Sequence, residues 1–166
     1  MRRPTGGMQV KSRHHLRSDE IDDLEAALAD QLGIDLDGDS YERVEFADVD
    51  REVVLVDGDP LVASFDGDLF VTVRGANAHS PEGHVVTVDS GAISFVSDGA
   101  NVMRPGITEA TADIEPGDLV VVAEEVHGKA LAIGRAETDG SDMVGDSGRV
   151  VESLHRVGDE LYEFRV

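Results

Sequence analysis

The residues best suited to binding a ligand lie in one stretch, where three turns built from small residues follow one another. Gly91-Ala92, Gly99-Ala100 and Pro105-Gly106 leave main-chain amides uncovered, because none of these turns carries a bulky side chain. Backbone amides brought together in this way can approach the phosphates and sugars of a nucleic acid strand. Asp89-Ser90 can cap a short helix that begins near Gly91. This pattern alone predicts a compact barrel with an open backbone groove.

A second candidate binding segment is the start of the chain. Residues 1–17 hold five of the fourteen Lys and Arg residues, and the first acid is Asp19. The candidate contacts in this segment are Lys11, Arg13 and Arg17. The alternative is a flexible start without a binding role, part of it an over-long gene model, since Met8 could equally begin the chain.

The sequence contains no convincing catalytic or metal-binding motif. The chain has no cysteine, which excludes disulfides, thiol nucleophiles and Cys-based zinc sites. Gly145-Asp146-Ser147-Gly148 resembles a protease nucleophile motif, but no histidine has a supporting motif around it. The acidic loop that starts at Asp35 has Ser40 and Phe46 where a calcium loop needs Gly and Glu. We expect no catalytic residue, no cofactor and no metal.

Acidic residues dominate the charge of the chain. Asp and Glu number 35 against 14 Lys and Arg, a net charge of −21, and the acids are spread along the whole sequence. Such a surface is typical of a protein from a molar-salt cytoplasm, where the Debye length is only about 3 Å. The rival interpretation is an acidic surface evolved for a basic partner. With no long apolar run and no export signal, we expect a cytosolic protein without a membrane partner.

The apolar patterning predicts two successive units. A helix capped by Ser18 should extend to Gly33, because apolar residues recur every three or four positions between them. Short strands separated by Asp-Gly turns should follow over about 42–73, which makes a small α+β module ending near Gly75. Residues 75–84 lack periodicity and are predicted to be a linker.

The second half of the chain is predicted to be mostly strands. The expected elements are a strand at Val85–Val88, a short helix at Ala92–Val96, a hairpin formed by Leu119–Val126 and Lys129–Ala136, and a last strand pair formed by Arg149–Leu154 and Leu161–Val166. Residues 140–148 should be a polar excursion. Many short strands with glycine turns and one small helix favour a closed barrel.

Two runs in the second half of the sequence carry a specific family resemblance. The runs Asp89–Ile93 and Gly99–Ile107 resemble the signature of PUA domains, closest to the malignant-T-cell-amplified-sequence family and its archaeal relatives. The hairpin around Val54–Pro60 and the opening Lys11–Leu16 are similar to that family's first domain. The resemblance implies an α+β N-terminal module followed by a PUA-type pseudo-barrel that is mostly β. The domains would be residues 1–83, with the basic segment 1–17 and the linker 75–84, and residues 84–166.

The resemblance also implies a function. It points to a non-catalytic RNA-binding protein, with ribosomal or transfer RNA as partner, in translation or RNA modification. Family members act with the small ribosomal subunit, so that subunit or a translation factor is a further expected partner of a monomeric chain from a halophilic archaeon. The alternative is a protein–protein adaptor module that docks a translation factor or a tRNA-modifying enzyme.

By resemblance, the helix after the first PUA strand and the strand that follows it form the RNA groove. The RNA-binding candidates carried over are Gly91, Ala92, Ser94, Phe95, Gly99, Ala100, Asn101, Met103, Arg104, Pro105 and Gly106. Arg104 could reach a phosphate, or it could simply pair with one of many neighbouring acids. From about 0.1 to about 3 M salt, four phosphate contacts would lose on the order of four decades of affinity. Binding must therefore depend on shape, hydrogen bonds and stacking, and we expect residues 91–106 and the basic opening segment to form one RNA face.

Overall fold

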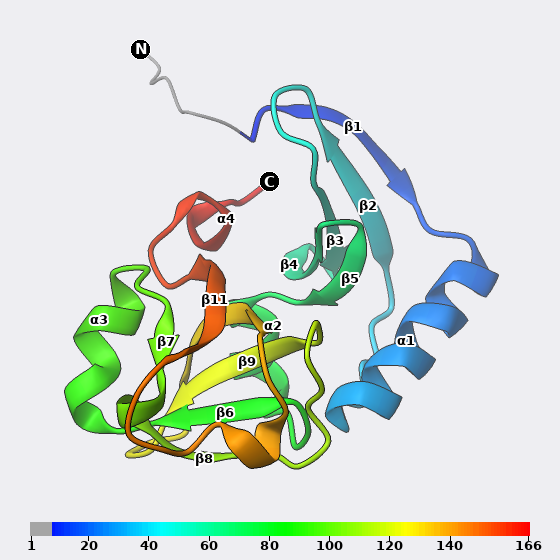
Figure 1. Ribbon diagram of the computed structural model, residues 1–166. Coiled ribbons are helices and arrows are strands. Elements are labelled where there is room, and N and C mark those ends of the chain that lie inside the picture. Colours follow the sequence, from blue (N-terminus) through cyan, green and yellow to red (C-terminus); the bar gives the residue numbers. More distant parts are fainter. Residues whose placement is uncertain (1–7) are drawn as a thin grey trace.

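The computed structural model describes residues 8–166, which form two β-sheets and the helices around them (Figure 1). The first sheet is an antiparallel meander in which each strand pairs with the next in sequence. Its strands are β1 (Val10–His15), β2 (Tyr41–Phe46), β3 (Glu52–Val56), β4 (Asp59–Phe65) and β5 (Asp68–Val71). Asp57-Gly58 and Asp66-Gly67 have positive φ at both residues, the conformation that tight hairpin turns need. The predicted meander is confirmed, and it includes a strand in the basic opening segment.

The predicted N-terminal helix is α1 (Ser18–Leu32), which packs its leucines inward. Leu24, Leu28 and Leu32 are buried, as their spacing requires. Gly33 ends the helix with φ of 68°, a left-handed conformation that glycine adopts at little cost. The N-cap is Arg17 and not Ser18, because the Glu20 carboxylate accepts a 3.0 Å hydrogen bond from the Arg17 backbone amide. This part of the prediction is one residue off.

The second sheet curves into a nearly closed pseudo-barrel with the strand order β7-β11-β10-β9-β6-β8. Its strands are β6 (Val85–Val88), β7 (Val102–Met103), β8 (Ile107–Ala110), β9 (Leu119–Glu124), β10 (Ala130–Ala136) and β11 (Arg149–Arg156). Strands β6 and β9 run parallel, and the other pairs are antiparallel. The short elements between strands are η1 (Ser90–Ala92), α3 (Ile93–Ser97), η2 (Arg104–Gly106) and η3 (Gly140–Asp142). The mostly β character and the hairpin of β9 and β10 are as predicted.

Two secondary-structure predictions are wrong. Half of the predicted linker is the helix α2 (Val73–His79), where Thr72 caps the helix by accepting a 3.1 Å hydrogen bond from the Gly75 amide. A Cβ on Gly75 would collide with the Leu61 carbonyl, so this helix sits directly against β4. A local pattern cannot reveal a helix that is held by such tertiary contacts. The predicted domain boundary at residues 83 and 84 falls between α2 and β6 and stays a prediction.

The second error is the last strand. Residues after β11 form the short helix α4 (Glu160–Glu163), because the Asp159 carboxylate accepts a 2.9 Å hydrogen bond from the Tyr162 amide and caps it. Strand β11 pairs with β10 and β7 instead. Leu161 and Phe164, the C-cap of α4, are both buried, and their spacing of three positions is that of one face of a helical turn and not of a strand.

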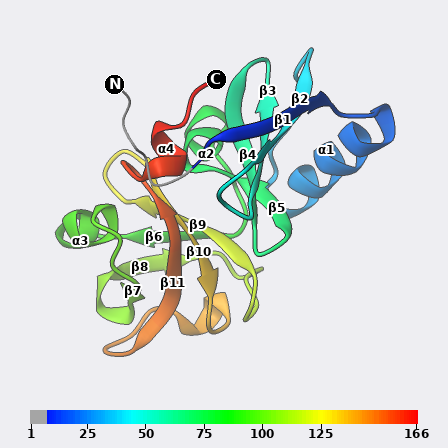
Figure 2. The ribbon, with the colours of Figure 1, turned by 90° about the horizontal axis from the view of Figure 1, so that it is seen from above.

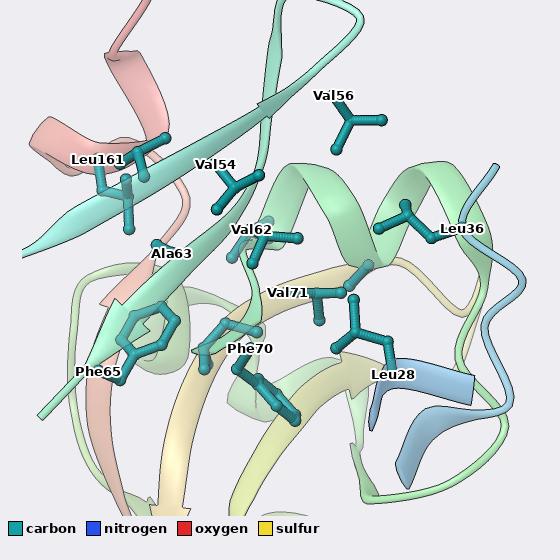
Figure 3. Close-up of a cluster of buried hydrophobic side chains, with 14 of the residues drawn as sticks. Leu28, Leu36, Val54, Val56, Val62, Ala63, Phe65, Phe70, Val71 and Leu161 are labelled. Atoms are coloured by element: carbon teal, nitrogen blue, oxygen red, sulfur yellow. The ribbon is translucent and has the colours of Figure 1, made fainter. Parts of the chain in front are cut away.

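The two sheets share one hydrophobic core, part of which Figure 3 shows. Phe70, Val54 and Leu28 come from the first sheet and α1, and Ile133 and Leu161 pack into the same cluster from the second half of the chain. A second cluster fills the interior of the pseudo-barrel, around Val86 and Val120 among others. Among residues 8–166, no helix is both long and apolar enough to cross a membrane.

Candidate functional site

The helix α3 and the turns beside it enclose a hollow of about 390 Å³, which we call the α3 groove. The groove gathers most of the residues predicted between 91 and 106. Its lining consists of Asp89, Gly91, Ala92, Phe95, Val96, Ala100, Asn101, Val102, Met103, Pro105 and Gly106. Of the candidates in this stretch, only Ser94, Gly99 and Arg104 do not line it. The structure therefore brings the three predicted turns together.

Two large apolar side chains stand exposed at the α3 groove. Phe95 is 66% exposed and Met103 is 48% exposed. Asp89 is the one charged residue among those that line the groove, and residues 90–106 add a single acid, Asp98, and a single base, Arg104. A nearly uncharged surface with exposed apolar groups is unusual on a chain whose net charge is −21, and such surfaces commonly mark binding sites.

Hydrogen bonds fix the turns that line the groove. Asp89 accepts a 3.0 Å hydrogen bond from the Ala92 amide at its Oδ1, which confirms the predicted cap. The Asp89 amide donates at 2.9 Å to the carbonyl of Gly106, so η1 and η2 are clipped together. A Cβ on Gly106 would lie 3.1 Å from the Cβ of Ala92. Small residues are needed here because the two turns approach so closely.

Gly99 and Asn101 connect the α3 groove to strand β11. Gly99 has φ of 96°, and a Cβ there would lie 2.9 Å from Nε of Arg156. Asn101 accepts a 2.9 Å hydrogen bond from the Ser153 amide at its Oδ1, which ties the groove to β11. Arg156 and Ser153 were not singled out from the sequence, since they lie more than fifty residues further along the chain and carry no local motif.

Arg104 lies beside the groove and forms hydrogen bonds with residues of the 140–148 segment. Its Nε donates to the Asp142 carbonyl at 2.9 Å, and its Nη1 donates to the Ser147 carbonyl at 3.0 Å. Its Nη2 also forms a 3.0 Å ion pair with the Asp142 carboxylate. Of the two interpretations of Arg104, the geometry matches the one in which it pairs with a neighbouring acid.

The basic candidates of the opening segment lie on the first sheet. Arg13 in β1 forms a 2.9 Å ion pair with Glu42, and Arg17 contacts Asp19 at 3.1 Å. These hydrogen-bonded carboxylates raise the pKa of both guanidinium groups. Lys11 lies near the start of β1. None of the three lines the α3 groove, and both views place β1 away from α3 (Figure 1, Figure 2). The expected single face of residues 91–106 and the opening segment is not formed by direct contact.

Metal ligands do not cluster in the part of the chain that the structure describes. No group of three or more His, Asp or Glu side chains within residues 8–166 is arranged to hold a metal ion. The arrangement at the α3 groove offers apolar contact, stacking and backbone hydrogen bonds.

The second half of the chain matches a known family of domains. The PUA domain family model matches residues 84–158. An uncharacterised protein of Methanocaldococcus jannaschii is 37% identical over 117 residues, which is 70% of this chain and 72% of that protein. Translation machinery-associated protein 20 of Saccharomyces cerevisiae is 35% identical over 118 residues, which is 67% of this chain and 65% of the yeast protein.

A human protein and a solved structure are also similar to this chain. Malignant T-cell-amplified sequence 2 of Homo sapiens is 35% identical over 82 residues, which is 47% of this chain and 45% of that protein. The chain thus spans less than two thirds of the yeast and human relatives. The structure of a conserved PUA domain protein from Thermoplasma acidophilum has a TM-score of 0.79 at 30% identity, over 92% of this chain and 98% of that one. The chain therefore belongs to the PUA-domain proteins and is homologous to the family of malignant T-cell-amplified sequence and translation machinery-associated protein 20, together with its archaeal members.

Proposed function

We propose that this protein binds structured RNA, ribosomal or transfer RNA, through the α3 groove and catalyses no reaction of its own. Membership of the PUA-domain proteins supports RNA binding, and kinship with proteins named for the translation machinery supports a role connected to translation. The part of the chain that this proposal depends on is the stretch from Gly91 to Gly106.

The observation that carries the proposal is the exposure of Phe95 and Met103 on an almost uncharged surface. Each phosphate contact contributes a slope of about −0.7 to −0.9 to the dependence of log K on log salt, so charge contacts fade at molar salt. Stacking of a base on an aromatic ring contributes about 1–3 kcal/mol and does not depend on counterion release. A groove with an exposed ring suits RNA binding by a protein of net charge −21.

Within the groove, each group would have a distinct role. The Phe95 ring, 66% exposed on α3, would stack on an unpaired base. Met103, across the hollow on β7, would cover the other side of that base with a flexible apolar side chain. The small residues Gly91 and Ala100 would let the ribose-phosphate chain approach the main chain.

The test is RNA binding by the Phe95→Ala variant, in about 2–3 M KCl and again at lower salt. Loss of one stacking contact should weaken binding by about 5- to 150-fold, equivalent to about 1–3 kcal/mol. Val126→Ala is the matched control, because Val126 is also an exposed apolar residue, at 58%, but lies in the turn between β9 and β10. The control should bind like the wild type.

Equal RNA affinity of the wild type and Phe95→Ala would contradict the groove as the site. Absence of RNA binding by the wild type at every salt concentration would contradict the function itself. If a translation factor still co-purified with the chain in high salt after nuclease digestion, the adaptor interpretation would replace it.

A further inference from the structure

The Lys and Arg side chains of residues 8–166 divide into two groups. Six of them lie within 4.0 Å of a carboxylate, namely Arg13, Arg17, Arg43, Arg104, Arg135 and Arg149. The other six have no such partner within the described residues, although the chain has 35 acids. Bases without a carboxylate partner are the ones that can neutralise a phosphate with the least competition.

Three of these unpaired bases follow one another around the junction of the two sheets. Arg51 and Arg156 line one hollow of about 590 Å³, beside α4. Arg51 also lines a neighbouring hollow of about 550 Å³, whose other base is Lys11. Arg51 thus stands between the two hollows, and the three bases form a series from β11 to β1.

Arg156 connects this series to the α3 groove. Its Nη1 donates at 2.9 Å to the carbonyl of Ser97, the last residue of α3. Its side chain also covers Gly99, where the absent Cβ would be 2.9 Å from Nε. Gly99 precedes Ala100, which lines the groove. The groove and the first hollow therefore adjoin at the turn that follows α3.

Backbone carbonyls hold both guanidinium groups while leaving donors available. Nε of Arg51 donates to the Ser64 carbonyl at 3.2 Å, and its guanidinium lies 5.0 Å from the centre of the Phe65 ring. Burial lowers the pKa of Arg51, although the nearby charges of Asp159 and Asp66 act in the opposite direction. The remaining guanidinium nitrogens of Arg51 and Arg156 make no hydrogen bond within residues 8–166, and none of them is a buried atom.

The hollow between Arg51 and Arg156 also has acids, and their placement matters. Burial raises the pKa of Asp159, but hydrogen bonds outweigh this effect, so the net pKa is lowered. The donors are His155 and the backbone amides of Tyr162 and Arg156, and the Asp159 carboxylate faces them. Asp50 and Glu160 line the hollow but lie more than 4.0 Å from either guanidinium. Glu45, Asp50, Glu52 and Asp66 line the neighbouring hollow, and none of them forms an ion pair with Lys11 or Arg51 within residues 8–166.

From this arrangement we infer that an RNA strand leaving the α3 groove continues over the Gly99 turn and places successive phosphates on Arg156, Arg51 and Lys11. This inference rests on the proposed function. The bases that contact RNA are then mainly those at the sheet junction, and Lys11 is the one candidate of the opening segment that takes part. Arg104 and Arg13, which are engaged by acids, make no phosphate contact.

The experiment measures RNA affinity as a function of salt, from about 0.3 to about 3 M KCl, for the full chain. Arg156→Gln and Arg51→Gln should each reduce the salt slope by about 0.7, so the affinity ratio of wild type to variant shrinks about fivefold over that decade. Arg156→Lys and Arg51→Lys keep the charge and should keep the wild-type slope. Arg13→Gln is the matched control for a paired arginine and should leave the slope unchanged.

Phe95→Ala separates the two proposals. If it weakens binding while Arg156→Gln and Arg51→Gln match the wild type in affinity and slope, the phosphate path is wrong and the RNA groove stands. If the wild type binds no RNA, the proposed function itself is wrong.

A second measurement covers glutamine variants that fail to fold. In the wild type, the NMR signals of the Nε–Hε groups of Arg156 and Arg51 should shift when a short single-stranded RNA is added, and that of Arg13 should not. Unchanged signals of Arg156 and Arg51 would overturn the inference. Equal shifts with inorganic phosphate at the same phosphate concentration would overturn it too, because the hollow would then be a site for free phosphate.

Discussion

The phenylalanines of this fold lie in two very different surroundings. Phe70 of β5, in the first sheet, is 1% exposed and belongs to the core that both sheets share. Phe95 of α3, at the groove of the pseudo-barrel, is 66% exposed. The residue type is the same, but only Phe70 is covered by the packing of one sheet against the other. An apolar side chain on this fold therefore contributes to stability or to binding according to what covers it.

Polar groups differ between the two regions as well. At the sheet junction, Nε2 of His155 accepts a 3.1 Å hydrogen bond from the Val73 amide, and Nδ1 donates to Asp159 at 2.9 Å. The buried imidazole is fully satisfied and joins β11 to the start of α2. At the groove, the polar groups of Asp89 and Asn101 hold turns in place and leave the apolar surface open.

The largest expected effect compares the two phenylalanines directly. Phe70→Ala should lower the free energy of unfolding by about 3–5 kcal/mol, because it leaves a cavity in the shared core. Phe95→Ala should change it by no more than about 0.5 kcal/mol, since the ring is mostly in solvent. Urea unfolding of both variants in the same buffer measures this. Comparable losses in the two variants would contradict the distinction between core and groove.

His155→Ala should have the next largest effect on stability. The substitution leaves the buried Val73 amide without its acceptor and removes a ring that stacks on Phe65 with centroids 6.0 Å apart. The expected loss is about 3 kcal/mol in the free energy of unfolding. His14→Ala is the control, because His14 is an exposed residue of β1. A His155→Ala variant as stable as that control would show that the contact between β11 and α2 contributes little.

Arg104→Ala tests the edge of the groove with a smaller effect. The variant loses the hydrogen bonds to Asp142 and Ser147, which should cost about 1 kcal/mol of stability and make residues 140–148 easier to cleave with protease. Because the guanidinium is already engaged, the salt slope of RNA binding should stay that of the wild type. A slope reduced by about 0.7 would instead assign Arg104 a phosphate contact.

The smallest expected effect is a dependence on pH at the sheet junction. Asp159 has a lowered pKa in the folded chain, so it stabilises the fold above the ordinary Asp value of about 3.9 and loses that contribution as the pH falls through its folded pKa. The free energy of unfolding should therefore fall more steeply below about pH 4 in the wild type than in Asp159→Asn. Parallel pH profiles of the two proteins would contradict this role.

Local features of the sequence predicted much of the fold. The Asp-Gly turns at residues 57–58 and 66–67 and the leucine spacing of α1 act over a few residues, so their strands and helix could be placed without coordinates. The PUA resemblance rested on residues 89–107, and the comparisons confirm it. The turns of that stretch also line one groove, as the small residues indicated.

Local sequence features did not predict the interactions between distant segments. Arg104 reaches Asp142, 38 residues away, and Arg156 lies over the Gly99 turn. In a chain with 35 acids, a base can meet many carboxylates, and composition does not tell which bases do so. The basic opening segment was prominent in the sequence, yet its Arg13 is held by Glu42.

Turn chemistry and apolar periodicity were enough to define most strands, the first helix and the family, because each depends on neighbours within a few positions. Packing of one sheet on the other settled the rest. It stabilised α2 within an aperiodic stretch and made the end of the chain a helix. It also buried Phe70 while Phe95 stayed exposed, and it left Arg51 and Arg156 without an ion-pair partner within residues 8–166. These outcomes depend on contacts between residues far apart in the chain, which no local pattern encodes.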